Sequence, residues 1–105
     1  MIITTIDYIP GREIHEIIDI ARGSTVRARH VGRDIVAGFR NLVGGEIDEY
    51  TKLMADAREQ AIDRMIADAQ DMGADAIINV RFTTAMITQG ASEIMAYGTA
   101  IKLKP

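Results

Sequence analysis

The sequence contains no cysteine and no tryptophan, and it has only two phenylalanines and three tyrosines. The absence of cysteine excludes a disulfide framework, a Cys-ligated zinc or iron–sulfur centre and a thiol nucleophile. With so few aromatic side chains, the core of a single subunit must be thin. The strictly apolar runs, such as Ile35–Phe39, fall far short of the roughly 20 residues that span a bilayer. No targeting segment is visible, so we expect a cytoplasmic protein that does not bind membranes.

Positive and negative charges are also nearly balanced. Lys and Arg number 12 and Asp and Glu number 15, which gives a net charge of −3. This balance offers no electrostatic attraction for nucleic acid, so we expect no nucleic-acid partner. The length of 105 residues, with 48% hydrophobic and 26% charged residues, is that of one folded domain, residues 1–105.

Alternating and β-branched segments predict strands near both ends of the chain. Ile2–Ile6 is short and β-branched, and residues 75–87 and 93–103 alternate apolar and polar side chains. The last two segments flank a glycine-containing turn and predict an antiparallel hairpin. Residues 13–28 fit either a helix or a strand with a bulge or bend at Gly23, and the pattern favours the strand only slightly.

Two helices are expected in the middle of the chain. Residues 30–43 place apolar side chains on one face and end at Gly44-Gly45. Residues 46–72 repeat small and apolar side chains every three or four positions and end at Gly73. The element order is therefore β-β-α-α-β-β, an α+β domain in which two helices cover one face of an antiparallel sheet.

The length of the second helix predicts self-association. At 1.5 Å per residue it would be roughly 40 Å long, whereas a compact domain of this size has a radius of gyration near 13 Å. Its small residues Ala57, Ala61 and Ala69 would allow another element to approach closely. We therefore expect a homo-oligomer. The alternative is a monomer with a kinked or frayed helix.

Several stretches of the chain match one family signature in the right order. They are Arg33–Gly45, Tyr50, Ala57–Glu59, Gly73–Ile78 and Gly98–Lys102. On these residues the sequence resembles the YbjQ-like family of uncharacterised proteins, whose members are often labelled putative heavy-metal-binding. The resemblance implies a small α+β subunit that forms a homopentameric ring. It also implies that residues 13–28 form a strand.

The family label makes metal ligands worth examining. Soft metals prefer thiolates, which are absent here, so a site must use histidine, carboxylate or methionine sulfur. His30 and Asp34 lie four residues apart and would share one face of the first helix, within reach of one divalent ion. The remaining ligands would have to come from a symmetric ring or another strand. The alternative is that Asp34 is a first-turn carboxylate favoured by the helix dipole. His15 is expected to be an exposed strand residue.

Candidate residues for a small ligand lie at two other places. Arg33 belongs to a group of arginines at the start of the first helix that could hold a phosphate, although a solvated charged surface is the preferred interpretation because no glycine-rich loop accompanies it. Asn79 and Arg81 are expected to project from one strand face. Arg81 would either pair with a carboxylate such as Glu93 at a subunit interface, which we prefer, or bind an anion in a cavity.

The sequence gives little support for catalysis. No Ser-His-Asp arrangement or nucleophile-elbow motif is visible, and the acidic residues near Glu46 suit a helix N-terminus. We therefore expect a non-enzymatic, homo-oligomeric binding protein that holds a metal ion or small ligand where subunits meet. The alternative is an oligomeric scaffold with no small ligand.

Overall fold

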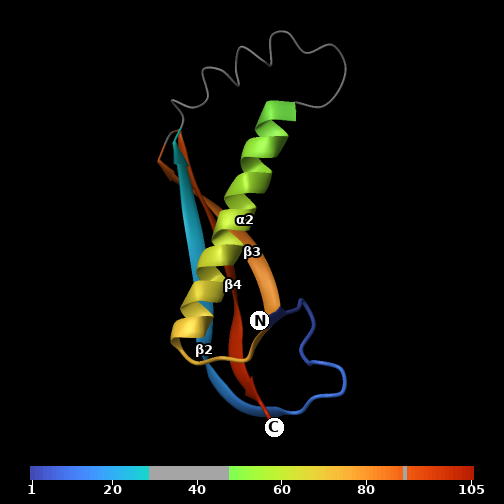
Figure 1. Ribbon diagram of the computed structural model, residues 1–105. Helices are drawn as coiled ribbons and strands as arrows, with labels where there is room; N and C mark the ends of the chain where they lie inside the picture. Colours follow the sequence, from blue (N-terminus) through green and yellow to red (C-terminus); the bar gives the residue numbers. More distant parts are fainter. Residues whose placement is uncertain (29–47, 89) are drawn as a thin grey trace.

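A computed structural model describes residues 1–28, 48–88 and 90–105, and it is an α+β unit (Figure 1). The elements are β1 (Ile2–Ile3), β2 (Ile14–Ala28), α2 (Asp48–Asp71), β3 (Ala76–Thr88) and β4 (Ala91–Leu103). Within these residues, four strands form one sheet in the order β1-β3-β4-β2, and one helix lies along it. The second helix of the sequence analysis is thus confirmed. The other helix predicted, residues 30–43, lies outside the described residues.

The sheet is mixed, so the expectation of a wholly antiparallel sheet is wrong. Strands β3 and β4 form the predicted antiparallel hairpin, and β2 pairs antiparallel with β4. β1, however, pairs parallel with the start of β3, with Ile2 opposite Ala76 and Ile3 opposite Ile77. A parallel pair needs a long crossover connection, and β2 and α2 lie in the connection here. A short β-branched segment carries no signal for the direction in which it pairs.

The segment with ambiguous periodicity is a strand. β2 pairs with β4 over its length, which confirms the strand implied by the family resemblance. The register runs without interruption through Gly23, which lies opposite Ala96, and its irregularities fall nearer the start of the strand. The predicted bulge at Gly23 is therefore wrong. A Cβ on Gly23 would collide with the helix backbone, lying 2.5 Å from the Ala61 carbonyl oxygen, so glycine is needed for close approach.

The main core lies between α2 and the sheet. Helix residues Ala57, Ala61, Met65 and Ala69 are fully buried. They pack in one cluster with small sheet residues, among them Ala21, Ala96 and Ala100. The small residues of the helix were expected to admit another element, and that element is the chain's own sheet.

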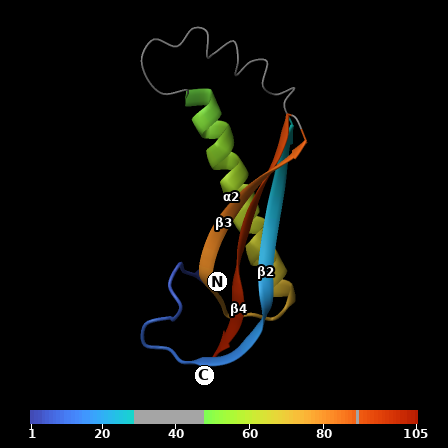
Figure 2. The same cartoon turned by 180° about the vertical axis from the view of Figure 1, so that it is seen from behind.

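A second, smaller core lies on the opposite face of the sheet. Ile9, from the loop between β1 and β2, is buried there with four sheet residues, namely Ala76, Ile78, Ile101 and Leu103. Figure 2 shows this N-terminal loop at the lower end of the sheet. The loop covers only that end, so the rest of this face, which we call the open face, is not covered by any described residue.

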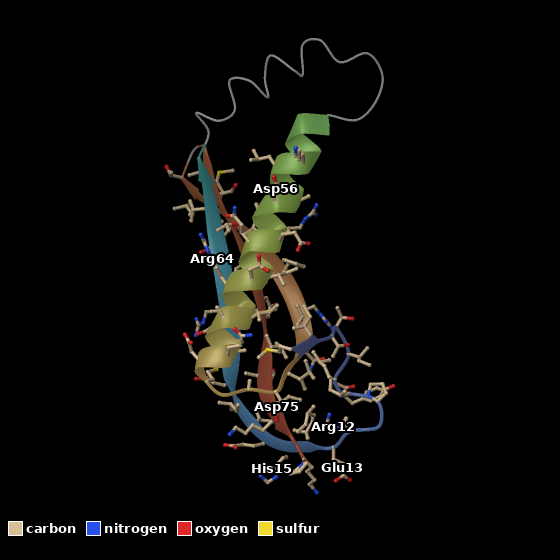
Figure 3. The ribbon with its side chains drawn as sticks, viewed as in Figure 1. Arg12, Glu13, His15, Asp56, Arg64 and Asp75 are labelled. Carbon is tan, nitrogen blue, oxygen red and sulfur yellow. The ribbon has the colours of Figure 1, made fainter. Side chains whose placement is uncertain are left out.

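Side chains of α2 cap the free edge of β2. The Asp68 carboxylate accepts a hydrogen bond of 3.0 Å from the Arg22 backbone N–H, and the Arg64 guanidinium donates to the Ser24 carbonyl oxygen (Figure 3). The buried Thr25 hydroxyl donates to the Ala57 carbonyl oxygen at 3.2 Å. The Arg22 N–H and the Ser24 carbonyl oxygen, two groups that another strand could pair with, are thereby occupied. α2 itself is too polar to cross a bilayer, and it is the single helix found in the described ranges.

Candidate ligand-binding face of the sheet

Both residues predicted to bind a metal, and one predicted to bind a small ligand, lie outside the described residues. His30, Asp34 and the neighbouring Arg33 fall there. His15, at the start of β2, is exposed as expected, and Figure 3 shows it at the lower end of the molecule near Glu13. Glu13 is engaged elsewhere, in an ion pair of 2.9 Å with Lys104.

The described part of the chain does not build a metal site by itself. No group of three or more His, Cys, Asp or Glu side chains that could hold an ion occurs among the described residues. The chain also has no thiolate to offer, which is the donor that soft heavy metals prefer. The donors in these ranges therefore do not fit a heavy-metal centre.

The predicted ligand residues of β3 lie at a β-bulge. The pairing with β4 shifts between Ile78 and Arg81, so that Ile78 lies opposite Thr99 and Arg81 opposite Tyr97. Asn79 sits within this shift with a φ of 53°, in the left-handed region that asparagine tolerates better than most residues. The extra residue interrupts the alternation from which Asn79 and Arg81 were expected to share a face.

Arg81 is tethered by backbone oxygens. Its Nη1 atom donates to the Thr5 carbonyl oxygen at 2.8 Å and to the Val80 carbonyl oxygen at 2.9 Å. No ion pair joins it to a carboxylate within the part of the chain that the structure describes, and Glu93 lies opposite Ala85 in the register. One guanidinium nitrogen of Arg81 is thus held at the outer edge of β3, and the other nitrogens keep N–H donors without a partner among the described residues.

The register brings two further residues beside Arg81. Tyr97 of β4 lies directly opposite Arg81 on one side and directly opposite Arg22 of β2 on the other. Arg22, Tyr97 and Arg81 therefore form a row across three neighbouring strands, which we call the Arg–Tyr–Arg row. Because Gly23 and Ala96 face α2, their neighbours in this row face the opposite way, on the open face.

All three residues of the Arg–Tyr–Arg row are exposed. Residues beside it on the same face supply hydroxyl groups, namely Ser24, Thr83 and Thr99. Arg22 is fixed through its backbone N–H by Asp68, and its guanidinium makes no hydrogen bond or ion pair within the described ranges. Such a surface can attract an anion to its two guanidinium groups, while the Tyr97 ring can stack on a guanidinium plane.

Sequence reasoning found Arg81 but missed Arg22 and Tyr97. These residues are far apart in the chain, and no local motif connects them. What connects them is the register of β2 and β3 on β4, which depends on the bulge at Asn79. A correct strand assignment without that bulge would have placed another residue opposite Tyr97.

Comparisons with known proteins place the chain among uncharacterised relatives. Residues 1–104 match a family described as "Putative heavy-metal-binding". A UPF0145 protein of Methanosarcina acetivorans is 56% identical over 103 residues, covering 98% of this chain and 97% of the relative. A UPF0145 protein of Archaeoglobus fulgidus is 55% identical over 104 residues, covering 99% and 96%.

One solved structure shares the fold. It is a protein with unknown function from Pediococcus pentosaceus, with a TM-score of 0.67 over 99% of this chain and 98% of that chain. Its sequence identity of 19% supports likeness of fold alone. None of these names states an activity.

Proposed function

This chain belongs to the YbjQ-like family, and we propose that it is a non-enzymatic homo-oligomer that binds a small ligand where its subunits meet. The pentameric ring implied by the family resemblance is the form that we propose. The supporting observation is the set of large apolar side chains left uncovered on the sheet. The partner proposed is a second copy of the same chain, not nucleic acid or membrane.

The uncovered side chains lie on both faces of the sheet. Met86 is 80% exposed near the end of β3, with Phe82 and Ile87 exposed close by. On β2, Ile17 is 68% exposed and Val26 is 54% exposed. Scattered apolar residues are normal on a surface, but these recur along two strands, β2 and β3, that flank β4 in one thin sheet. Burying them between copies would supply the apolar contact that each subunit lacks.

The edge of β3 supports the same proposal. Hydrogen bonds to Thr4 and Ile6 occupy this edge as far as Val80. Beyond it, no described strand pairs with residues 82–88 on the side that faces away from β4, and that stretch contains no charge, proline or glycine. The edge of β2, in contrast, is capped by side chains of α2. An uncharged open edge is a site at which a strand of another copy can add.

A substitution at Met86 tests the proposed assembly. Met86→Glu places a charge on a side chain that is already exposed in one subunit, so it leaves the subunit folded but penalises burial between copies. We expect sedimentation velocity to show the wild type as a ring and the variant shifted to smaller species at micromolar concentration. Gln70→Glu, which adds the same charge on the exposed side of α2, should leave the ring intact.

Three results would contradict the proposal. One is a wild-type particle of 11.5 kDa, the mass of a single chain. Another is a ring that Met86→Glu and Gln70→Glu disturb equally. A ring that carries no small molecule and binds none would contradict the ligand part and support the scaffold alternative.

A further inference from the structure

We infer that the open face of the sheet carries a binding site for a small oxyanion, formed by the Arg22 and Arg81 guanidinium groups on either side of the Tyr97 ring. The chemical class is a phosphate or carboxylate compound with at least two negative charges. This inference rests on the proposed function, because it names the kind of ligand that the protein binds.

Spacing across the strands supports one shared site. Residues directly opposite one another on neighbouring strands have Cβ atoms about 5 Å apart, so the two arginine Cβ atoms lie about 10 Å apart with Tyr97 between them. Arginine side chains are long enough to converge over this gap. The Nη1 atom of Arg81 is bound to the Thr5 carbonyl oxygen on the side of β3 away from Tyr97, so the other nitrogens of this guanidinium would have to contact the ligand.

The charges around the row favour an anion. Two guanidinium groups repel each other unless a negative charge lies between them. Asp68 contacts the Arg22 backbone and not its side chain, and Glu93 lies four residues along β4 from Tyr97. Among the described residues, neither arginine forms an ion pair. An oxyanion would satisfy both guanidinium groups through charge-assisted hydrogen bonds, two of them parallel where an oxyanion edge meets an arginine fork.

The other groups of the row set the preferred shape of the ligand. The Tyr97 ring offers a flat surface and its hydroxyl a hydrogen-bond donor, and Thr83 and Ser24 add hydroxyl groups in the next row. These neutral groups can bind oxygen atoms without adding charge. The site should therefore prefer a compact polyanion with several oxygens to a simple monovalent ion.

Calorimetry with two probes tests the inference and separates the two sources of oxyanion. We would titrate the full chain with pyrophosphate and, separately, with citrate. The same salt concentration would be kept throughout, because exposed charge contacts are screened. Binding of pyrophosphate identifies a phosphate site and binding of citrate a carboxylate site. Either result supports the inference, and failure of both probes to bind overturns it.

Matched arginine variants locate the site. Arg22→Gln should weaken binding of the effective probe about tenfold, since a charge-assisted hydrogen bond is lost. The variant should still fold, because no bond of that guanidinium is present in the described ranges. Arg58→Gln, the same change on the exposed surface of α2, should leave the affinity unchanged. Equal effects of the two variants would show general charge attraction only and would overturn the site.

Sedimentation of the same samples distinguishes this inference from the proposed assembly. If neither probe binds and the ring persists, the oxyanion site is wrong while the assembly stands. If Arg22→Gln breaks the ring in the absence of probe, the arginine pairs with a carboxylate of another copy, and the inference is again wrong. Tyr97→Leu should weaken binding of the probe without changing the oligomeric state. Tyr97→Phe keeps the aromatic side chain and should weaken binding less than Tyr97→Leu does.

Discussion

At the scale of the residue, Gly23 decides how closely the helix and the sheet can pack. It lies in β2 beneath α2, and a Cβ there would meet the Ala61 carbonyl oxygen and the Met65 backbone nitrogen. Both of those atoms are backbone atoms, so they cannot move aside as a flexible side chain would. The fully buried alanines Ala57 and Ala61 complete the same close contact from the helix side.

Substitution of Gly23 should therefore destabilise the fold. Gly23→Ala should lower the free energy of unfolding by about 3 kcal/mol, at the upper end of the usual cost of overpacking, because the whole helix must move away from β2. Chemical denaturation would measure the change. Ser24→Ala, at the neighbouring position on the open face, should change stability by less than about 1 kcal/mol. A Gly23→Ala variant as stable as the wild type would contradict the described packing.

The metal site suggested by the sequence also depends on individual side chains. If His30 and Asp34 ligate one divalent ion, His30→Ala and Asp34→Ala should each weaken its binding while the ring stays intact. His15→Ala, a histidine that is exposed on β2, is the control and should have no effect. Calorimetry with a panel of divalent ions measures the affinities. Unchanged affinity in both variants would eliminate the site.

At the scale of the element, the two edges of the sheet differ in how they are protected. The edge of β2 is capped by Asp68 and Arg64 of α2, whereas the edge of β3 beyond Val80 is bare in the described structure. The helix thus hinders strand pairing around Arg22 and Ser24 on one edge and leaves the other edge available. This difference makes β3 the element through which copies are proposed to meet.

Removal of the Asp68 cap should affect β2 specifically. Asp68→Ala leaves the Arg22 N–H without its acceptor, which should cost about 0.5–1 kcal/mol. Asp63→Ala makes the same change on the exposed surface of α2 and has the same effect on helix propensity, so the difference between the two variants isolates the cap. Hydrogen exchange should show faster exchange of the Arg22 amide in Asp68→Ala alone. Equal exchange in both variants would contradict the cap.

Sequence periodicity predicted most elements but only one of their pairings, that of β3 with β4. Alternation predicted the β3–β4 hairpin, and three- to four-residue repeats predicted α2, because each pattern reflects which side chains face the core. The parallel pairing of β1 and the bulge at Asn79 depend on long-range contacts that leave no local pattern. Since the Arg–Tyr–Arg row depends on that bulge, only Arg81 of its three members could be identified from the sequence.

At the scale of the whole molecule, the subunit is long and thin. Its extents are 55 × 27 × 16 Å and its radius of gyration is 17.2 Å, compared with about 13 Å for a compact domain of this length. The predicted overhang of the helix assumed a compact domain, and that assumption is wrong because the sheet is elongated to match the helix. Assembly is therefore supported instead by the apolar side chains and the β3 edge that the elongated sheet leaves uncovered.

The mass of the wild-type particle tests this account most directly. Native mass spectrometry of the full chain at micromolar concentration should give a closed ring, with five copies of the 11.5 kDa chain as the proposed number. A folded particle of 11.5 kDa at that concentration would contradict it, because the exposed apolar side chains of β2 and β3 would then need no partner.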